Sequence, residues 1–128
     1  MALRQSVSTD GAPEAIGPYS QAIRTGSLLF CSGQIPLDPS TGEIVKDEIE
    51  GQARRCLENL AAVCEAAGGS LAQAVRCTVY LTDMNDFARV NETYASFFDG
   101  DEPPARVAIG VASLPKGADV EIDAVVAL

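Results

Sequence analysis

The clearest pattern in the sequence is a helical repeat of apolar positions between residues 47 and 68. Small and apolar residues recur there at intervals of three and four, which places them on one helix face: Ile49, Ala53, Cys56, Leu57, Leu60, Cys64 and Ala67. Gly68 and Gly69 follow, and glycine commonly ends a helix. A second stripe, formed by Phe87, Val90, Tyr94 and Phe97 or Phe98, predicts another helix, which Thr82 or Asp83 can cap.

Alternation with a period of two predicts strands around these helices. Residues 75–82 place Val75, Cys77, Val79 and Leu81 on one face, and residues 120–127 place Glu121 and Asp123 on a polar face. Two more strands flank a turn at residues 25–27, a short extended piece covers Glu43–Val45, and another strand runs from Arg106 to Leu114. The order is strand pair, helix, strand, helix, strand pair. It predicts one α+β domain over residues 1–128, with the helices on one face of a sheet.

The net charge of the chain makes some classes of binding partner improbable. The chain has 9 Lys and Arg against 18 Asp and Glu, a formal net charge of -9. This balance disfavours binding to nucleic acid, which needs clustered cations, and binding to anionic membranes. The sequence has no apolar N-terminal stretch typical of a signal peptide and no apolar run near the ~20 residues that span a bilayer. We therefore expect a cytoplasmic protein.

The residue types also restrict the chemistry. The four cysteines have no CxxC spacing and lie in apolar patterns, so we predict reduced core residues. There is no histidine, which excludes Ser-His-Asp and Cys-His mechanisms. Asp83 and Asp86 are explained by helix capping, and no metal site is expected. Catalysis would have to use carboxylates, tyrosine, arginine, backbone groups and water.

Four positions are candidates, and each has an ordinary structural alternative. Arg106 follows two prolines that stiffen the chain, but most arginines are simply solvated. Glu121 is either on a solvated strand face or a carboxylate that positions water. Tyr19 is either a core aromatic or a phenol facing a cleft. Gly33 lets a ligand approach the backbone closely.

Taken together, the sequence blocks resemble the Rid family, also called YjgF or endoribonuclease L-PSP proteins. Five segments carry the resemblance: Ala15–Ile23, Cys31–Val45, Gln52–Gly68, Val79–Phe98 and Pro103–Ala127. The blocks "IGPYSQ", "SGQIP" and "PAR" occur within them in that order, and the segments together cover nearly the whole chain.

The resemblance implies a chorismate-mutase-like α+β fold, a mixed sheet with two helices on one face. It also implies a homotrimer with active sites between neighbouring subunits and no cofactor or metal. The implied activity is hydrolysis of 2-iminopropanoate, 2-iminobutanoate and their enamines to 2-oxo acids and ammonia, a form of metabolite damage control.

Site residues follow from the same resemblance. It implies that Arg106 binds the substrate carboxylate and that Glu121 holds the attacking water. Tyr19, Ser32, Gly33, Asn91 and Ala108 complete the implied pocket. Many relatives have a cysteine two residues after the arginine of "PAR". Here that residue is Ala108, which argues against a nucleophilic thiol. The loop at residues 99–104 also looks short, which leaves the size of the substrate open.

The sequence leaves three other functions open. A regulatory trimer could bind 2-oxo acids without turnover, using Arg106 alone. A related enzyme could act on a different imine or enamine. An endoribonuclease is disfavoured by the acidic charge and by only 5% aromatic residues, because gripping RNA normally needs basic and stacking groups.

Overall fold

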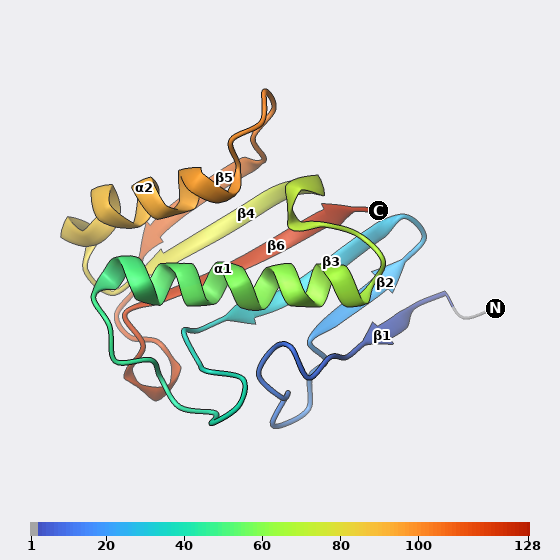
Figure 1. Ribbon diagram of the computed structural model, residues 1–128, viewed down its shortest axis with the longest axis horizontal. Coiled ribbons are helices and arrows are strands. Elements are labelled where there is room, and N and C mark those ends of the chain that lie inside the picture. Colours follow the sequence, from blue (N-terminus) through green and yellow to red (C-terminus); the bar gives the residue numbers. More distant parts are fainter. Residues whose placement is uncertain (1–2) are drawn as a thin grey trace.

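The two predicted helices lie on the same face of a mixed six-stranded sheet (Figure 1). The computed structural model describes residues 3–128. The helices are α1 (Ile49–Ala66) and α2 (Phe87–Phe97). The strands are β1 (Gln5–Val7), β2 (Ala22–Thr25), β3 (Leu28–Gln34), β4 (Ala74–Leu81), β5 (Ala105–Gly110) and β6 (Val120–Ala127). Neither helix is long and apolar enough to cross a membrane.

The strand order is β1-β2-β3-β6-β4-β5, which puts β6 inside the sheet. All neighbours are antiparallel except β4 and β5, which are parallel. The last two strands are therefore not paired with each other as the sequence order suggested, because β4 lies between them. A helix joins β4 to β5, and such a crossover returns the chain in the parallel direction. The strand β5 also ends at Gly110, well before Leu114. The three-residue β1 was not predicted, since it is too short to show alternation.

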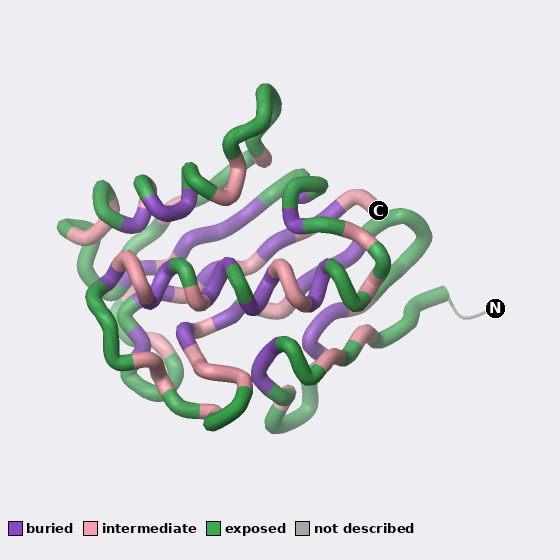
Figure 2. The backbone as a smooth tube through the Cα atoms, in the orientation of Figure 1, coloured by how far each residue is buried: buried purple, intermediate pink, exposed green. Residues whose placement is uncertain are grey.

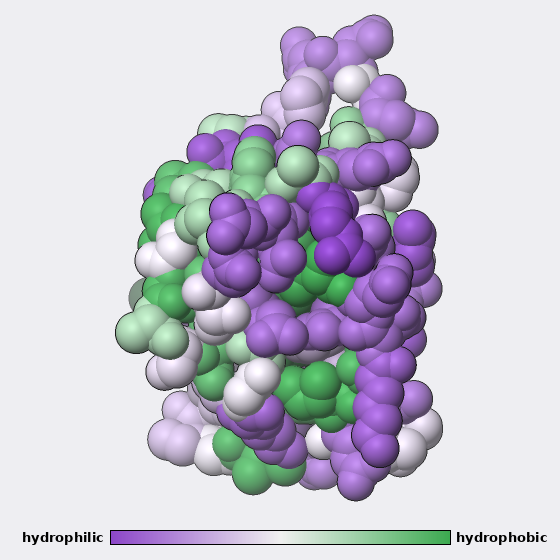
Figure 3. Space-filling model, turned by 90° about the vertical axis from the view of Figure 1, so that its left-hand side faces the viewer, coloured by the Kyte–Doolittle hydropathy of each residue, from purple (hydrophilic) through white to green (hydrophobic). Residues whose placement is uncertain are grey.

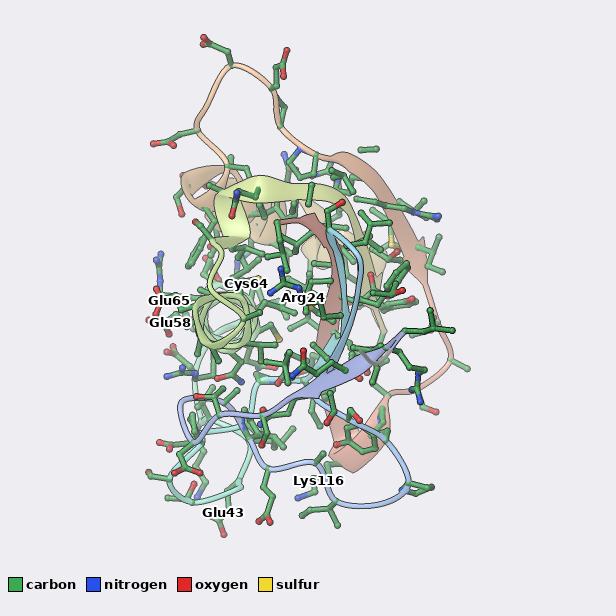
Figure 4. The ribbon with its side chains drawn as sticks, turned by 90° about the vertical axis from the view of Figure 1, so that its right-hand side faces the viewer. Arg24, Glu43, Glu58, Cys64, Glu65 and Lys116 are labelled. Carbon is green, nitrogen blue, oxygen red and sulfur yellow. The ribbon has the colours of Figure 1, made fainter. Side chains whose placement is uncertain are left out.

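The core lies between α1 and the sheet. Every apolar residue on the inner side of α1 from Ala53 to Cys64 is fully buried. Figure 2 shows buried segments alternating with exposed ones along this helix. In Figure 4, Cys64 lies on the side of α1 that faces the sheet, while Glu58 and Glu65 lie on its outer side. All four cysteines are free and buried, as predicted.

Two predicted details are wrong. Val75 was assigned to the buried face of its strand, but it is exposed because the register of β4 against β6 shifts between Ala74 and Arg76. Such a bulge turns one residue out of the alternation. Asp83 caps a short 3₁₀ turn at Met84–Asp86 by accepting a bond from the Asn85 N–H, and α2 begins only after that turn.

The strand β6 alternates as predicted. Its even-numbered residues are buried under the helices, and its odd-numbered residues, including Glu121 and Asp123, lie on the other side of the sheet. We call that uncovered side the open face. A second irregularity, between Cys31 and Gln34, shifts the register of β3 against β6 beside Glu121.

A buried glutamine ties the segment before β2 to the body of the protein. The Gln21 side-chain carbonyl accepts a bond from the Thr9 N–H at 2.7 Å. Its amide donates to the carbonyls of Thr9, Ala12 and Pro13 at 3.0, 3.3 and 2.8 Å. One side chain therefore satisfies four backbone groups, and it holds the loop that forms a wall of the site described below.

We predict that Gln21→Met lowers the free energy of unfolding by at least about 2 kcal/mol, because it leaves several buried backbone groups without partners. Urea denaturation measures the change. Gln5→Met makes the same chemical change at an exposed position on β1 and should cost much less. Equal stability of the two variants would contradict the role of Gln21.

Candidate functional site

The first half of the site is centred on the Glu121 carboxylate at the start of β6. Gly33 faces this carboxylate, and a Cβ atom at position 33 would overlap it. The glycine in the "SGQ" block is therefore explained by the space that Glu121 occupies. A glutamate on a strand between two other strands is held more rigidly than one on a loop.

Burial gives this carboxylate unusual chemistry. The pKa of Glu121 is raised above its ordinary value, first by burial and second by the nearby carboxylate of Asp123. A carboxylate with a raised pKa takes a proton more readily than an ordinary one, which suits it to proton transfer. Glu121 is half-buried and therefore does not lie on a fully solvated strand face.

Glu121 opens into a cleft of about 380 Å³ at the end of the sheet where β3 ends and β6 begins. Much of the cleft wall is apolar, with Pro13, Ile16, Ile35, Leu37 and Pro115 among the lining residues. Tyr19 also lines it and is 54% exposed, so this tyrosine is not a core aromatic. We call this the Glu121 cleft. It offers a small ligand an apolar wall, the phenol of Tyr19, and the charged side chains of Glu14, Lys116 and Glu121.

Ser32 lies in an adjoining groove that shares Tyr19 with the Glu121 cleft. Its hydroxyl donates to the Ser20 carbonyl at 2.6 Å. The hydroxyl proton is therefore engaged by the backbone. Ser32 holds the strand against the segment that carries Tyr19.

The second half of the site is centred on Arg106 of the edge strand β5. Its guanidinium carbon lies 4.9 Å from the ring centre of Tyr94 and 5.3 Å from that of Phe87. Its Nη1 donates to Oδ1 of Asn91 at 2.5 Å. Arg106, Asn91 and Tyr94 border a groove together with Pro103 and Pro104, and we call it the Arg106 groove. The structure therefore joins Asn91 to Arg106, as expected for neighbours in one site.

The two halves lie on opposite faces of the sheet. Arg106 pairs with Cys77, whose side chain is buried on the helix side, whereas Glu121 pairs with Tyr80, which lies on the open face beside Asp123. Directly paired residues point the same way. One copy of the chain therefore does not bring Arg106 and Glu121 to the same ligand.

Ala108 shares the helix-side face of β5 with Arg106 and packs against the core. It does not line the Arg106 groove. A methyl group here fills space under α2, so the structure adds no support for a direct ligand contact by Ala108.

Sequence reasoning missed two aromatic contacts of Arg106. Phe87 and Tyr94 were interpreted only as core positions of a helix. Their spacing from Asn91 could have predicted these contacts, because residues 87, 91 and 94 lie on one face of α2. Among the described residues, no group of histidine, cysteine or acidic side chains has the arrangement of a metal site.

Known proteins match this chain in sequence and in structure over nearly its whole length. Residues 9–128 match the family model "Endoribonuclease L-PSP". A RutC family protein of Pyrococcus horikoshii is 54% identical, over 96% of this chain and 97% of the relative. The 2-iminobutanoate/2-iminopropanoate deaminase of Salmonella typhimurium is 46% identical, over 96% of this chain and 97% of that protein. The crystal structure of a putative endoribonuclease from Thermotoga maritima superposes with a TM-score of 0.94, at 50% identity and 97% coverage of both chains.

We predict that Glu121 titrates at a higher pH than an ordinary glutamate. On acidification its carboxylate should be protonated earlier than that of an ordinary glutamate, because burial disfavours the charged form. Asp123→Asn removes the nearby negative charge but not the burial. It should therefore lower the Glu121 midpoint only part of the way toward that of an ordinary glutamate. Carbon-13 NMR of the side-chain carboxyls measures both. A Glu121 midpoint equal to that of a glutamate in a short unstructured peptide would contradict the prediction.

Proposed function

The chain belongs to the endoribonuclease L-PSP family, also called the Rid or YjgF family, and from this premise we propose that it hydrolyses small 2-imino acids and their enamine tautomers to 2-oxo acids and ammonia. The observation that carries the proposal is the half-buried Glu121 carboxylate, seated against Gly33 at the base of a largely apolar cleft. A protein that only bound a ligand through the ligand's carboxylate would not need the Glu121 side chain, a carboxylate of its own with a raised pKa, in the binding site.

Glu121 acts on the water that attacks the imine carbon. In its charged form it accepts a proton from the water as the new C–O bond forms, which gives a carbinolamine. The same carboxyl then returns the proton to the nitrogen. As the C–N bond breaks and ammonia leaves, the Glu121 carboxylate takes the hydroxyl proton, which leaves the carbonyl of the 2-oxo acid. This proton then passes to the ammonia, which gives ammonium and restores the charged carboxylate. A protonated imine is already electrophilic, so these steps need only positioning and one proton carrier.

Arg106 holds the substrate carboxylate. A guanidinium can bind both oxygens of a carboxylate at once, which a lysine cannot do. This local positive charge also compensates for the net charge of -9, which on its own would repel an anionic substrate. The clamp fixes the imine carbon with respect to the water at Glu121.

Because these groups lie on opposite faces of one sheet, the complete site requires a second copy of the chain. Arg106 is on the edge strand β5, so a neighbour's β5 can place its guanidinium over the Glu121 cleft. The open face carries exposed apolar side chains, Leu28, Phe30, Val107 and Ile109, which suit contact with another copy. Figure 3 views the molecule from the end that holds the cleft, and apolar side chains gather along the uncovered side of the sheet. A homotrimer with three shared sites satisfies these requirements.

The family name also includes endoribonuclease activity. The acidic charge and the scarcity of aromatic residues do not favour a surface for gripping RNA. We therefore propose imine hydrolysis alone, with 2-iminopropanoate and 2-iminobutanoate as the first substrates to test.

We predict that the wild-type protein removes imines produced by a threonine/serine dehydratase before semicarbazide can trap them. Arg106→Met should lower kcat/KM by about a hundredfold or more, because it removes the carboxylate clamp. Glu121→Gln should lower it by roughly 10²–10⁴, because an amide cannot accept the proton. The measurement is the rate of semicarbazone formation with each variant.

Matched controls come from the outer side of α1. Arg54→Met and Glu58→Gln make the same chemical changes at exposed positions and should leave the rate unchanged. An inactive wild type on both imines would refute the proposal for these substrates. Tight binding of 2-oxobutanoate by such an inactive protein would instead support a regulatory role.

We further predict complementation between two inactive variants. If Arg106 and Glu121 of one site come from different copies, Arg106→Met and Glu121→Gln subunits refolded together in equal amounts should recover about a quarter of the wild-type activity, since a random pairing leaves one site in four intact. Each variant refolded alone provides the control. Failure to recover activity in mixed oligomers confirmed by mass spectrometry would show that the site is not shared.

A further inference from the structure

Helix α2 presents three residues to Arg106 in one stripe. Phe87, Asn91 and Tyr94 are four and three positions apart, which puts them on the same helix face. Two of them supply aromatic rings, and the third supplies the hydrogen-bond acceptor at Oδ1. The guanidinium is thus held from the helix side, away from the open face of the sheet.

The aromatic contacts leave the donors of the guanidinium free. Arginine has five N–H donors. Among residues 3–128, the Arg106 guanidinium makes one hydrogen bond, from Nη1 to Asn91. A cation over an aromatic face is attracted by the ring without giving up a donor. Holding Arg106 by rings therefore restrains it and keeps most of its N–H groups available to a carboxylate.

Tyr94 is the closer and more rigid of the two rings. It is only 5% exposed, it packs against Phe98 with 4.7 Å between ring centres, and it lies within the core cluster. Its hydroxyl is buried beside the Cys77 thiol, a weak partner, and has no ordinary hydrogen bond among the described residues. Burial and Cys77 raise the pKa of Tyr94 well above its usual value, so the phenol stays neutral. The contact with Arg106 is consequently made by the ring and not by a phenolate.

We propose that Tyr94 is a positioning residue of the carboxylate clamp, whose ring holds the Arg106 guanidinium in the orientation that receives the substrate carboxylate. This inference rests on the proposed function. It assigns to Tyr94 a role in substrate affinity that depends on its aromatic face and not on its hydroxyl. A flexible arginine must be ordered when a ligand binds, and a pre-ordered one avoids that cost.

The first test does not depend on activity. Proton–nitrogen NMR of the arginine side chains reports the ring current that Tyr94 exerts on the Arg106 Nε–H group. Tyr94→Leu should shift this resonance and broaden it, whereas Tyr94→Phe, which keeps the ring, should leave it nearly unchanged. Arg106→Met assigns the signal by its disappearance. An unchanged Arg106 resonance in Tyr94→Leu would overturn the positioning role, whatever the enzyme does.

The second test measures affinity for the product 2-oxobutanoate and the split between KM and kcat for the imine. Tyr94→Leu should weaken binding and raise KM by about tenfold, with a smaller change in kcat, while Tyr94→Phe should stay within about twofold of wild type. Phe97→Leu is the matched control, because Phe97 makes a similar contact, 6.0 Å from the guanidinium carbon of Arg54, outside the site. Tyr94→Met, which also lacks a ring, replaces Tyr94→Leu if the latter fails to fold.

A double-mutant cycle separates this role from general support of the fold. In an Arg106→Met background, Tyr94→Leu should weaken 2-oxobutanoate binding no further, because the group through which Tyr94 acts is gone. A further loss of similar size would overturn the proposal. Normal binding by Arg106→Met alone would instead refute the clamp of the proposed function, and the NMR result would still decide whether Tyr94 orders the guanidinium.

Discussion

The alternation of side chains along β6 is the constraint on which the rest of this structure depends. Val120, Ile122, Ala124 and Val126 are buried beneath the helices, so Glu121 and Asp123 must lie on the open face. A slip of one residue would bury both carboxylates in the core and expose the apolar set. Polar bonds reinforce this register, because Asp123 accepts a bond from the Tyr80 hydroxyl at 2.9 Å and from the Thr78 N–H at 3.0 Å. The same pattern that builds the core therefore sets the position of the candidate acid–base group.

The partly buried position of Glu121 lowers the stability of the folded state and raises the pKa of the carboxyl group. Partial burial disfavours its charged form, which raises its pKa and weakens the folded state at neutral pH by a corresponding amount. The folded state tolerates this because the surrounding strand is anchored by the core. Gly33 has no side chain and therefore leaves room for the Glu121 carboxylate. Gly33 is itself exposed, so its burial does not stabilise the fold. Under the proposed function, this acid beside an open space can take a proton from the attacking water.

Arg106 has the opposite surroundings. It lies on an edge strand, among aromatic rings and an amide, with no carboxylate within ion-pair distance among the described residues. A guanidinium paired with an acid would be unavailable to an anionic ligand, whereas rings restrain it and leave its charge uncompensated. Under the proposed function, the separation of this cation from Glu121 within one chain has a simple consequence. The two groups would act on one ligand only when a second copy of the chain is present, and the exposed apolar side chains of the open face suit such a contact.

Local pattern determined much of this protein. Helical and alternating periods correctly predicted both helices, the strands around the turn at residues 25–27, the central strand β4 and the alternation of β6, because these elements each bury one face. The family blocks in the sequence point to Arg106, Glu121, Gly33 and Tyr19. Only the tertiary structure showed that β4 lies between β5 and β6, that a bulge exposes Val75, and that Tyr94 contacts Arg106. It also showed that Arg106 and Glu121 lie on opposite faces. These features depend on which strands become neighbours and in what register. Strand pairing and register are determined by contacts between residues far apart in the sequence. A local pattern of apolar and polar positions therefore does not predict them.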